Sequence, residues 1–563
     1  MIDRRSRTLF PVSLCMMLAA LALGGCGGGG DDGGNSPPPA TNVTISGKIT
    51  FDRLAFKTVT GTGLNIAAPV ESAARQVTVE ALDAASADAI LATTTTDDGG
   101  AYSVTVPANR NVKIRAKAEM IRTGATPSWD FSVRNNTNGN ALYAVDGDAA
   151  SSGTSNSTRN VRAPSGWGST SYTGARVAAP FAILDTIYSA KQVILSAAAS
   201  TTFPALALYW STQNRPVNNL CTTNGDIGTT FYTQEVAARD SGNCTPPVAL
   251  AAGIYILGDY ADGNGDTDEF DQHVIAHEFG HYIEDKFSRS DSIGGSHSGG
   301  DRLDLRVAFG EGWGNAYSGM ALNDPVYRDS FGGVAGDTGF SLEADNQNGE
   351  GWFSEFSVGE ILWDLFDDTK EDPIALGFAP IYSVMTGEQK DTEALTSIFS
   401  FSSALRAANA SQAVNIDAVL TGELISGTDA FGSDETNSGG VSTALPIYTD
   451  ITVGQAPIAV CSIGTSDRNK LGYRRFLRLN LATTSVLTIT ATGAVSNQPG
   501  VAATDPDIYV YRSGTIVAFD DAVSPTAMIS QNAFSAGLHI IEVYDYDLGV
   551  LPRCMAVSVQ GVP

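Results

Sequence analysis

Three of the chain's five histidines lie in one short stretch, at positions His273, His277 and His281. Residues four apart lie one above the other on the same face of an α-helix. Apolar residues recur at helical spacing through the same stretch: Phe270, Val274, Ile275, Phe279 and Ile283. The pattern therefore predicts a helix that presents imidazoles along one side.

The segment from His277 to His281 has the form HExxH. Two imidazole nitrogens on successive turns can bind one Zn²⁺ at about 2.0–2.1 Å. Glu278 then lies close enough to act on a water at the metal without being a ligand. Three histidines at i, i+4 and i+8 of a straight helix cannot all reach one tetrahedral ion. We therefore expect His273 to support the site or the fold, outside the ligand set.

A catalytic zinc needs a third protein ligand and an open fourth position. The downstream run FGEGWGN places Glu311 between two glycines, where it could approach the metal closely as the chain enters a second helix. Asp301 and Asp304 are rival third ligands, as in aspzincins. The metzincin pattern is excluded, because Glu284 and Phe287 stand where that pattern needs glycine and histidine.

The combination HEFGH…GEGWGN resembles the gluzincin peptidases, most closely their fungalysin-like branch. It is also similar to the arrangement of zinc ligands in thermolysin. The resemblance covers about residues 270–370. It implies that His277, His281 and Glu311 hold a zinc ion and that Glu278 is the general base toward a zinc-activated water. The implied activity is that of a metalloendopeptidase acting on protein or peptide substrates.

Two departures from the gluzincin pattern concern residues around the zinc. The family has an Asp four residues beyond the ligand Glu, where this chain has Asn315. An amide oxygen still accepts a hydrogen bond from a ligand imidazole but adds no charge. The family also uses a later His to stabilise the oxyanion, and this chain has no His between His297 and His539. That role would pass to Tyr382, to His297, or to no residue.

Two acidic segments are candidates for calcium. Asp259–Glu269 resembles half a calcium loop, but an EF-hand loop starting at Asp262 needs glycine sixth and glutamate twelfth, where the chain has Thr267 and His273. The alternative is a solvated acidic loop with Asp268 near a helix N-terminus. In the C-terminal segment the candidates, with exposed turn carboxylates as the alternative, are Asp505, Asp507, Asp520 and Asp521.

The sequence pattern of the other segments predicts mainly β-strands. Short alternating strands at 42–125 resemble a carboxypeptidase-regulatory-like β-sandwich, and residues 446–563, with TDPDIYVYRSG and GLHIIEVYDYD, resemble a pre-peptidase C-terminal β-sandwich. Helical spacing appears around 178–199, and the polar composition of 135–166 predicts loop. We therefore expect a multidomain protein in which an α+β gluzincin-like domain at 126–445 is flanked by two β-sandwiches.

The first residues carry an export signal. Three arginines precede the apolar run Leu9–Leu23, and Leu23-Gly24-Gly25-Cys26 looks like the lipobox of a bacterial lipoprotein. The resemblance implies a signal peptide at 1–25, lipidation of Cys26 and a Gly- and Pro-rich tether at 26–41, with the protein anchored in the cell envelope and periplasmic or surface-exposed. The alternative is ordinary secretion, with Cys26 incidental.

Charge and cysteine usage agree with an exported protein. The chain has 61 acidic against 34 basic residues, a net charge of −27, which disfavours binding to nucleic acid phosphates. Beyond Cys26, four cysteines allow three disulfide pairings. We expect Cys221 with Cys244 and Cys461 with Cys554, since each pair stays within one expected domain. None of the four has CxxC spacing, which disfavours a thiolate zinc site.

Two functions follow as hypotheses. The first is a lipid-anchored, extracytoplasmic zinc metalloendopeptidase. The second is a surface binding or adhesion lipoprotein that keeps a metallopeptidase fold with weak or no turnover. The intact set of His277, Glu278, His281 and Glu311 favours the enzyme, whereas the missing later histidine favours the binding protein.

The anchor can be tested with Cys26→Ser, which removes the thiol that the lipobox offers for acylation. We expect the variant to move from the membrane to the soluble periplasmic or extracellular fraction, because stable anchoring depends on acyl chains. Fractionation beside an unrelated membrane lipoprotein measures this. A variant that stays membrane-bound after a high-salt wash would place the anchor elsewhere.

Overall fold

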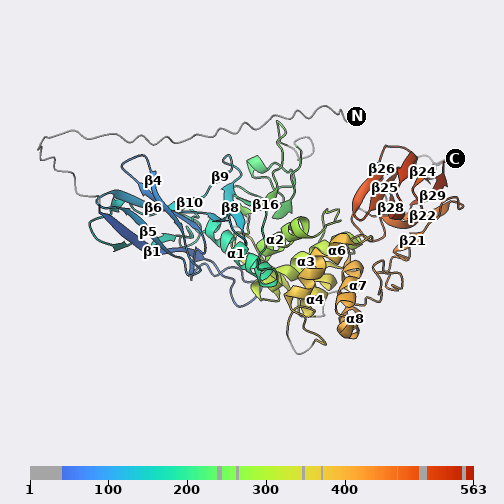
Figure 1. The fold of residues 1–563 in the computed structure, drawn as a ribbon, viewed down its shortest axis with the longest axis horizontal. Helices are drawn as coiled ribbons and strands as arrows, with labels where there is room; N and C mark the ends of the chain where they lie inside the picture. Colours follow the sequence, from blue (N-terminus) through green and yellow to red (C-terminus); the bar gives the residue numbers. More distant parts are fainter. Residues whose placement is uncertain are drawn as a thin grey trace, which may run out of the picture. The chain divides into compact units, whose positions relative to one another are not determined.

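The computed structural model describes residues 41–237, 244–260, 265–344, 349–368, 372–465, 467–493, 504–547 and 553–562. The chain divides after Thr41, and Asn42–Pro563 forms one compact unit. This unit is rich in β-strands, and its described α-helices fall between residues 179 and 422 (Figure 1). Among the described residues, no helix is both long enough and apolar enough to cross a bilayer. The expected signal peptide and Cys26 lie outside the described residues.

Two sheets are built from the N-terminal strands, which are β1 (Asn42–Arg53), β2 (Val70–Ala73), β3 (Thr78–Asp83), β4 (Ala89–Thr95), β5 (Ala101–Pro107), β6 (Asn111–Lys117), β10 (Ala144–Asp146), β11 (Ala150–Ser151), β12 (Ser157–Thr158) and β13 (Val161–Ala163). In the first sheet β2, β5, β12 and β13 pair with β1, and the second has the order β10-β6-β3-β4 with β11 beside β6. In β5 the side chains of Tyr102, Val104 and Val106 are buried. The predicted alternation of these strands is therefore present.

The prediction of loop for residues 135–166 is wrong. Four short strands of the N-terminal sheets lie there: β12 and β13 pair in parallel with β1, and β10 and β11 pair antiparallel with β6. Such strands gain stability from the ladder hydrogen bonds of the strands they border, so polar composition without apolar alternation does not reveal them. The N-terminal sheets thus take strands from beyond residue 125.

A central sheet follows, made of β7 (Glu119–Arg122), β8 (Trp129–Asn135), β9 (Ala141–Leu142), β14 (Leu206–Trp210), β15 (Phe231–Thr233) and β16 (Gly253–Ile256). Its order is β15-β16-β14-β8-β7, with β9 beside β8. β8, β14 and β16 are parallel, and α1 (Ala179–Ala197) lies in the connection from β8 to β14, where helical spacing predicts it. β15 is antiparallel to β16 and forms one edge of this sheet.

The remaining elements of this region are η1 (Thr222–Asn224), β17 (Gly258–Asp259), β18 (Asp266–Thr267), α2 (Gln272–Phe287), α3 (Leu305–Leu322), β19 (Val326–Phe331), β20 (Gly336–Ser341), α4 (Glu355–Asp364), α5 (Phe378–Thr386), α6 (Glu388–Asp391), α7 (Ile398–Ala408), η4 (Ala410–Gln412) and α8 (Ala413–Gly422). The helix predicted through HExxH is α2. α2 packs against α3, and α3 packs against α4. Every residue from Leu305 to Ala321 in α3 is buried. Most of these side chains are small or apolar, and the buried charged ones, Arg306 and Glu311, have partners.

One hydrophobic core runs from the N-terminal sheets through the central sheet into the helices. A second core belongs to the C-terminal sandwich. That sandwich consists of β21 (Tyr448–Asp450), β22 (Ile458–Ser462), β23 (Arg475–Leu481), β24 (Ser485–Gly493), β25 (Pro506–Arg512), β26 (Thr515–Asp520), β27 (Thr526–Phe534), β28 (Gly537–Asp545) and β29 (Arg553–Gly561). Its two sheets have the orders β21-β23-β28-β25-β26 and β22-β29-β24-β27.

Both expected disulfides are present. Cys221 is bonded to Cys244, and Cys461 to Cys554. The second pair joins directly opposed residues of β22 and β29. Disulfides of this kind are typical of proteins from oxidising compartments outside the cytoplasm.

A buried ion cluster joins the start of α3 to the C-terminal sandwich. Arg306 Nη1 donates to Glu542 Oε2 at 2.9 Å, and Arg306 Nε donates to Asp304 Oδ1 at 2.8 Å. Arg474 also pairs with Glu542, whose side chain is fully buried. Burial raises the pKa of Glu542, but the guanidinium groups of Arg306 and Arg474 outweigh it and hold that pKa at about 2.

Glu542→Gln should therefore destabilise the protein at pH 7 by roughly 3–5 kcal/mol, since Arg474 loses its buried counter-charge and Arg306 keeps only that of Asp304. The pKa of Glu542 is about 2 in the folded chain and 4.5 ordinarily. Its stabilising effect is thus complete above about pH 5 and is lost as the pH falls toward 2. Thermal unfolding of wild type and variant should show that their difference in stability becomes smaller as the pH falls across this range.

The matched control is Asp450→Asn, which removes the ion pair of Arg478 with a carboxylate that is 71% exposed. An exposed pair contributes less than about 1 kcal/mol. Equal destabilisation by the two substitutions would contradict the structural role given to the buried cluster.

Candidate metal centre

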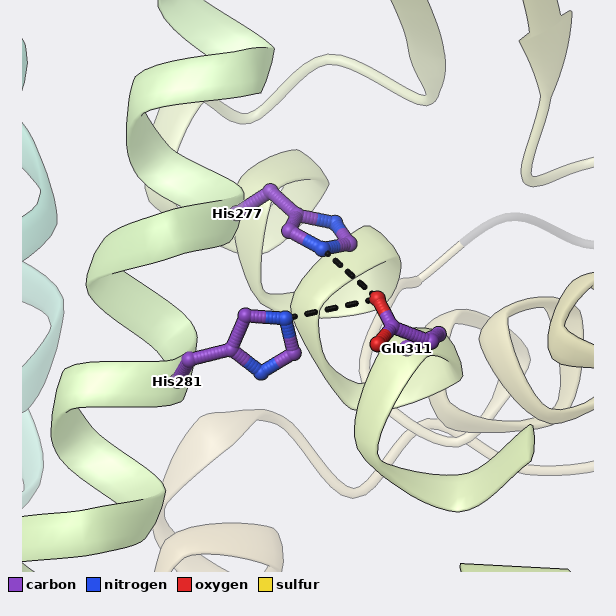
Figure 2. Close-up of side chains that lie close together, drawn as sticks. All are labelled: His277, His281 and Glu311. Atoms are coloured by element: carbon purple, nitrogen blue, oxygen red, sulfur yellow. Dashed lines mark hydrogen bonds and ion pairs between the residues drawn. The ribbon is translucent and has the colours of Figure 1, made fainter. Parts of the chain in front are cut away.

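The side chains of His277, His281 and Glu311 converge between α2 and α3 (Figure 2). The two histidines are one turn apart on α2, and Glu311 faces them from the second turn of α3. Glu311 Oε2 lies 3.2 Å from His277 Nε2 and 3.4 Å from His281 Nε2. Three atoms that ordinarily donate lone pairs to a metal thus surround one point.

These distances suit a zinc ion. Two ligand atoms that lie 2.0–2.1 Å from a tetrahedral ion are separated by roughly 3.3–3.4 Å. The two nitrogen–oxygen distances in the centre are close to this value. Two imidazoles and one carboxylate are also a donor set that zinc uses in catalytic sites.

Asn315 orients the first imidazole. Its Oδ1 lies 2.9 Å from His277 Nδ1. Because that oxygen only accepts, His277 Nδ1 is the donor, and Nε2 is the nitrogen that faces Glu311. Asn315 therefore occupies the position, and makes the contact, that the sequence assigns to it.

The glycines around Glu311 serve helix packing. A Cβ at Gly314 would lie 2.7–2.8 Å from atoms of the His277 ring, and a Cβ at Gly312 would lie 2.5 Å from Val358 Cβ on α4. A Cβ at Gly310 would meet nothing nearer than 3.6 Å. The expectation that Glu311 lies where the chain enters the helix is wrong, since six residues of α3 precede it.

Glu278 lies beside the three converging side chains and outside their group. Its carboxylate is buried, and its Oε2 accepts a hydrogen bond of 2.7 Å from the backbone N–H of Tyr232 in β15. Burial raises the pKa of Glu278. The backbone hydrogen bond fixes the orientation of the carboxylate.

At the centre, the attraction between opposite charges shifts the pKa values more than burial does. Burial raises the pKa of Glu311, but the imidazoles of His281, His277 and His297 outweigh this and hold it well below its usual value. Burial lowers the pKa of His281, but Glu311 and Glu284 raise it well above its usual value. In the chain alone, a proton on the His281 imidazole thus faces the Glu311 carboxylate. Histidines bind metals in their neutral form, so a metal would displace this proton.

His297 approaches Glu311 as part of a second group. Its Nε2 lies 3.5 Å from Glu311 Oε2 and 3.6 Å from Glu355 Oε2. Its Nδ1 lies 3.1 Å from the carbonyl oxygen of Gly295. Of the two side chains considered for the oxyanion, His297 is thus the one at the centre. The ring of Tyr382 stacks on Phe378, and its side chain hydrogen-bonds Thr201.

The other candidate ligands have partners elsewhere. Asp301 Oδ2 pairs with Lys470 at 3.0 Å. Asp304 caps α3 and binds Arg306. His273 Nε2 lies 3.2 Å from the carbonyl oxygen of Asp324, and its ring packs against Tyr327. Within the described residues, none of these three belongs to the group around Glu311.

The four C-terminal calcium candidates have partners within their own sandwich. Asp505 Oδ1 accepts from Ser524 N, Asp520 Oδ2 from Met528 N, and Asp521 Oδ2 from the hydroxyl of Tyr509. Asp507 hydrogen-bonds the side chain of Tyr544. Asp262, at the start of the other expected calcium loop, lies outside the described residues.

Three residues at the centre have no role assigned from the sequence: Tyr232, Glu284 and Glu355. Glu284 Oε2 lies 4.0 Å from His281 Nδ1. Residues three apart on a helix are neighbours, so the sequence alone could have predicted this contact. Tyr232 contributes through its backbone, and Glu355 comes from α4. Tertiary packing brings both residues to the centre, so the local sequence pattern does not predict their positions.

No protein-family model and no curated protein matches the chain. The pre-peptidase C-terminal domain of a collagenase from Bacillus anthracis is 14% identical, over 20% of this chain and 93% of that domain, with a TM-score of 0.16. The periplasmic lysozyme inhibitor PliG of Aeromonas hydrophila is 16% identical, over 20% of this chain and 97% of its own, with a TM-score of 0.13.

A 9R-lipoxygenase from Cyanothece is 8% identical, over 71% of this chain and 68% of its own, with a TM-score of 0.16. At such scores these likenesses carry no argument about function. None of the three is described as a gluzincin peptidase, so that family stays a prediction from the residues.

Gly314→Ala should weaken zinc binding at least about tenfold, because the new methyl group displaces the His277 ring from its hydrogen bond with Asn315. Competition with a zinc-chelating dye measures the affinity. Gly310→Ala in the same helix is the control, and it should leave the affinity unchanged. If both variants bind zinc as wild type does, the packing described for His277 does not support a metal.

Proposed function

We propose that this protein is an extracytoplasmic, lipid-anchored zinc metalloendopeptidase. The observation that carries the proposal is the placing of Glu278 beside, but outside, three donor atoms at the spacing of zinc ligands. A metal held only for structure would need no buried carboxylate next to it. The disulfides, the lipobox and the expected signal peptide support a location outside the cytoplasm.

In this proposal His277, His281 and Glu311 hold the zinc, and Asn315 fixes the orientation of His277. A bound zinc would polarise the scissile carbonyl and make a water molecule more acidic. Glu278 takes the proton of that water and delivers it to the leaving amine. Its hydrogen bond from Tyr232 N keeps the carboxylate in place for both transfers.

The position of β15 supports a peptide substrate. This strand forms an edge of the central sheet and touches Glu278 through Tyr232. An extended peptide can add to an edge strand as a further strand, and here it would do so beside the N–H of Tyr232, which is already bound to Glu278. A peptide paired with β15 would therefore pass beside the general base.

His297 is the side chain we assign to the oxyanion. Its Nε2 lies 3.5 Å from Glu311 Oε2, the oxygen that His277 and His281 also approach, and 3.6 Å from Glu355 Oε2. An N–H donor near the metal stabilises the charge that develops on the carbonyl oxygen. It takes the role of the later histidine that the sequence lacks.

The test is casein turnover and zinc content of the soluble 27–563 fragment, with and without a chelator. Glu278→Gln should keep its zinc, since Glu278 is not a ligand, and lose hydrolysis by at least about a hundredfold. Turnover at near wild-type rate by this variant would remove the assigned role. Zinc without turnover in wild type would favour the alternative of a binding lipoprotein.

Glu311→Ala tests the third ligand by the zinc content of the purified variant. It should lose most of its zinc, because only two donors remain. Asp301→Ala removes a carboxylate of the rival assignment and breaks a partly exposed ion pair with Lys470 and two hydrogen bonds from Ser298, and it should keep its zinc. The reverse outcome would support the aspzincin pattern.

A further inference from the structure

A second cluster of carboxylates lies before the start of α2, apart from the candidate zinc ligands. Asp266 in β18, Asp268 in the following turn and Asp329 in β19 each bring an oxygen within 4.8 Å of the others. Asp271, which immediately precedes α2, borders the same cluster and interacts with Asp329. Four acidic side chains from two distant segments of sequence are thus packed together.

The cluster is partly to fully buried, with Asp266 and Asp329 partly exposed, and it lacks positive partners among the described residues. Asp268 is 3% exposed and Asp271 is fully buried. Among the described residues, no Lys, Arg or His forms an ion pair with any of the four carboxylates; the nearby Arg176 binds Glu269 instead. Burial raises the pKa of Asp329 to about 7, and that of Asp268 well above its usual range. Like charges so close together, two of them buried, are costly unless something neutralises them.

Individual oxygen atoms show where a neutralising group would bind. Asp268 Oδ2 accepts from the hydroxyl of Thr230, and Asp271 Oδ2 accepts from Ser330 N at 2.7 Å and from Ser330 Oγ at 2.8 Å. The other oxygen of Asp268, Oδ1, is buried and has no hydrogen-bond partner among the described residues, whereas Asp271 also hydrogen-bonds Asp329. A buried oxygen without a donor is rare in folded proteins and calls for a ligand.

We propose that Asp266, Asp268 and Asp329, with Asp271 beside them, bind a calcium ion. All the available donors are oxygens, which hard divalent cations prefer, and several carboxylates around one point suit the six to eight oxygen ligands of Ca²⁺. Nitrogen and sulfur donors, which zinc prefers, are missing from the cluster. The proposal does not depend on the proposed peptidase activity.

The ion would couple β19 to the start of α2. Asp271 already binds Ser330 of β19, and Asp329 lies one residue away on the same strand. Tyr327, also on β19, packs its ring 5.5 Å from that of His273 and 6.2 Å from that of His277. Calcium bound here would therefore hold the strand that covers the histidine face of α2.

Calcium binding to the full chain can be measured by equilibrium dialysis, with the zinc concentration held constant. Wild type should bind about one more Ca²⁺ than either Asp268→Asn or Asp329→Asn. The control is the Asp520→Asn, Asp521→Asn double variant, which should bind as much as wild type. Equal binding by wild type and both single variants would overturn the proposal, as would tighter binding of Mg²⁺ than of Ca²⁺.

Thermal unfolding gives a second readout that a merely structural role would not produce. At a Ca²⁺ concentration a hundred times Kd, the ratio of folded to unfolded wild type should rise about a hundredfold. Asp329→Asn should lose this gain, yet equal or exceed wild type in stability without calcium, because it removes one of the repelling charges. A variant that is less stable than wild type by the same amount with and without calcium would contradict the site.

Discussion

The candidate centre depends on the close contact of α2 with α3. Gly280 on α2 faces Gly314 on α3, where a Cβ at Gly280 would lie 3.3 Å from Gly314 Cα. Trp313 Nε1 donates to the carbonyl oxygen of Gly280 at 2.9 Å and joins the helices at the same level. This contact sets the distance at which Glu311 meets the two imidazoles. Larger side chains at the glycines would move a ligand by more than a metal–ligand bond tolerates.

The surrounding elements hold this helix pair from several sides. The central sheet supplies Tyr232 to Glu278, and the C-terminal sandwich binds Arg306 at the start of α3 through Glu542. β19 covers the histidine face of α2 through Tyr327. The centre is therefore assembled from segments that are far apart in the sequence, and its geometry depends on the folded unit as a whole.

Local patterns predict much of this arrangement. The four-residue spacing of the histidines predicts α2, and the run GEGWGN identifies Glu311 and Asn315, which the structure brings to His277. Both disulfide pairs follow from keeping each within one expected domain. These features depend on residues close in sequence or on a specific residue type, so they can be read without knowing the packing.

Other features arise only from tertiary packing. Asp329 joins Asp268 across some sixty residues, and Glu355 reaches His297 from α4. The strands between residues 141 and 163 pair with β1, β6 and β8, although their composition is that of loops. Local periodicity does not predict such contacts, because the partner that stabilises each segment lies in another part of the chain.

The central claim is that two histidines and one glutamate form a zinc site. X-ray absorption at the zinc edge of the purified full chain tests it most directly. The account predicts one zinc per chain, with two imidazoles and oxygen ligands at about 2.0–2.1 Å. Zinc bound through sulfur, zinc without imidazole ligands, or no stoichiometric zinc would contradict it.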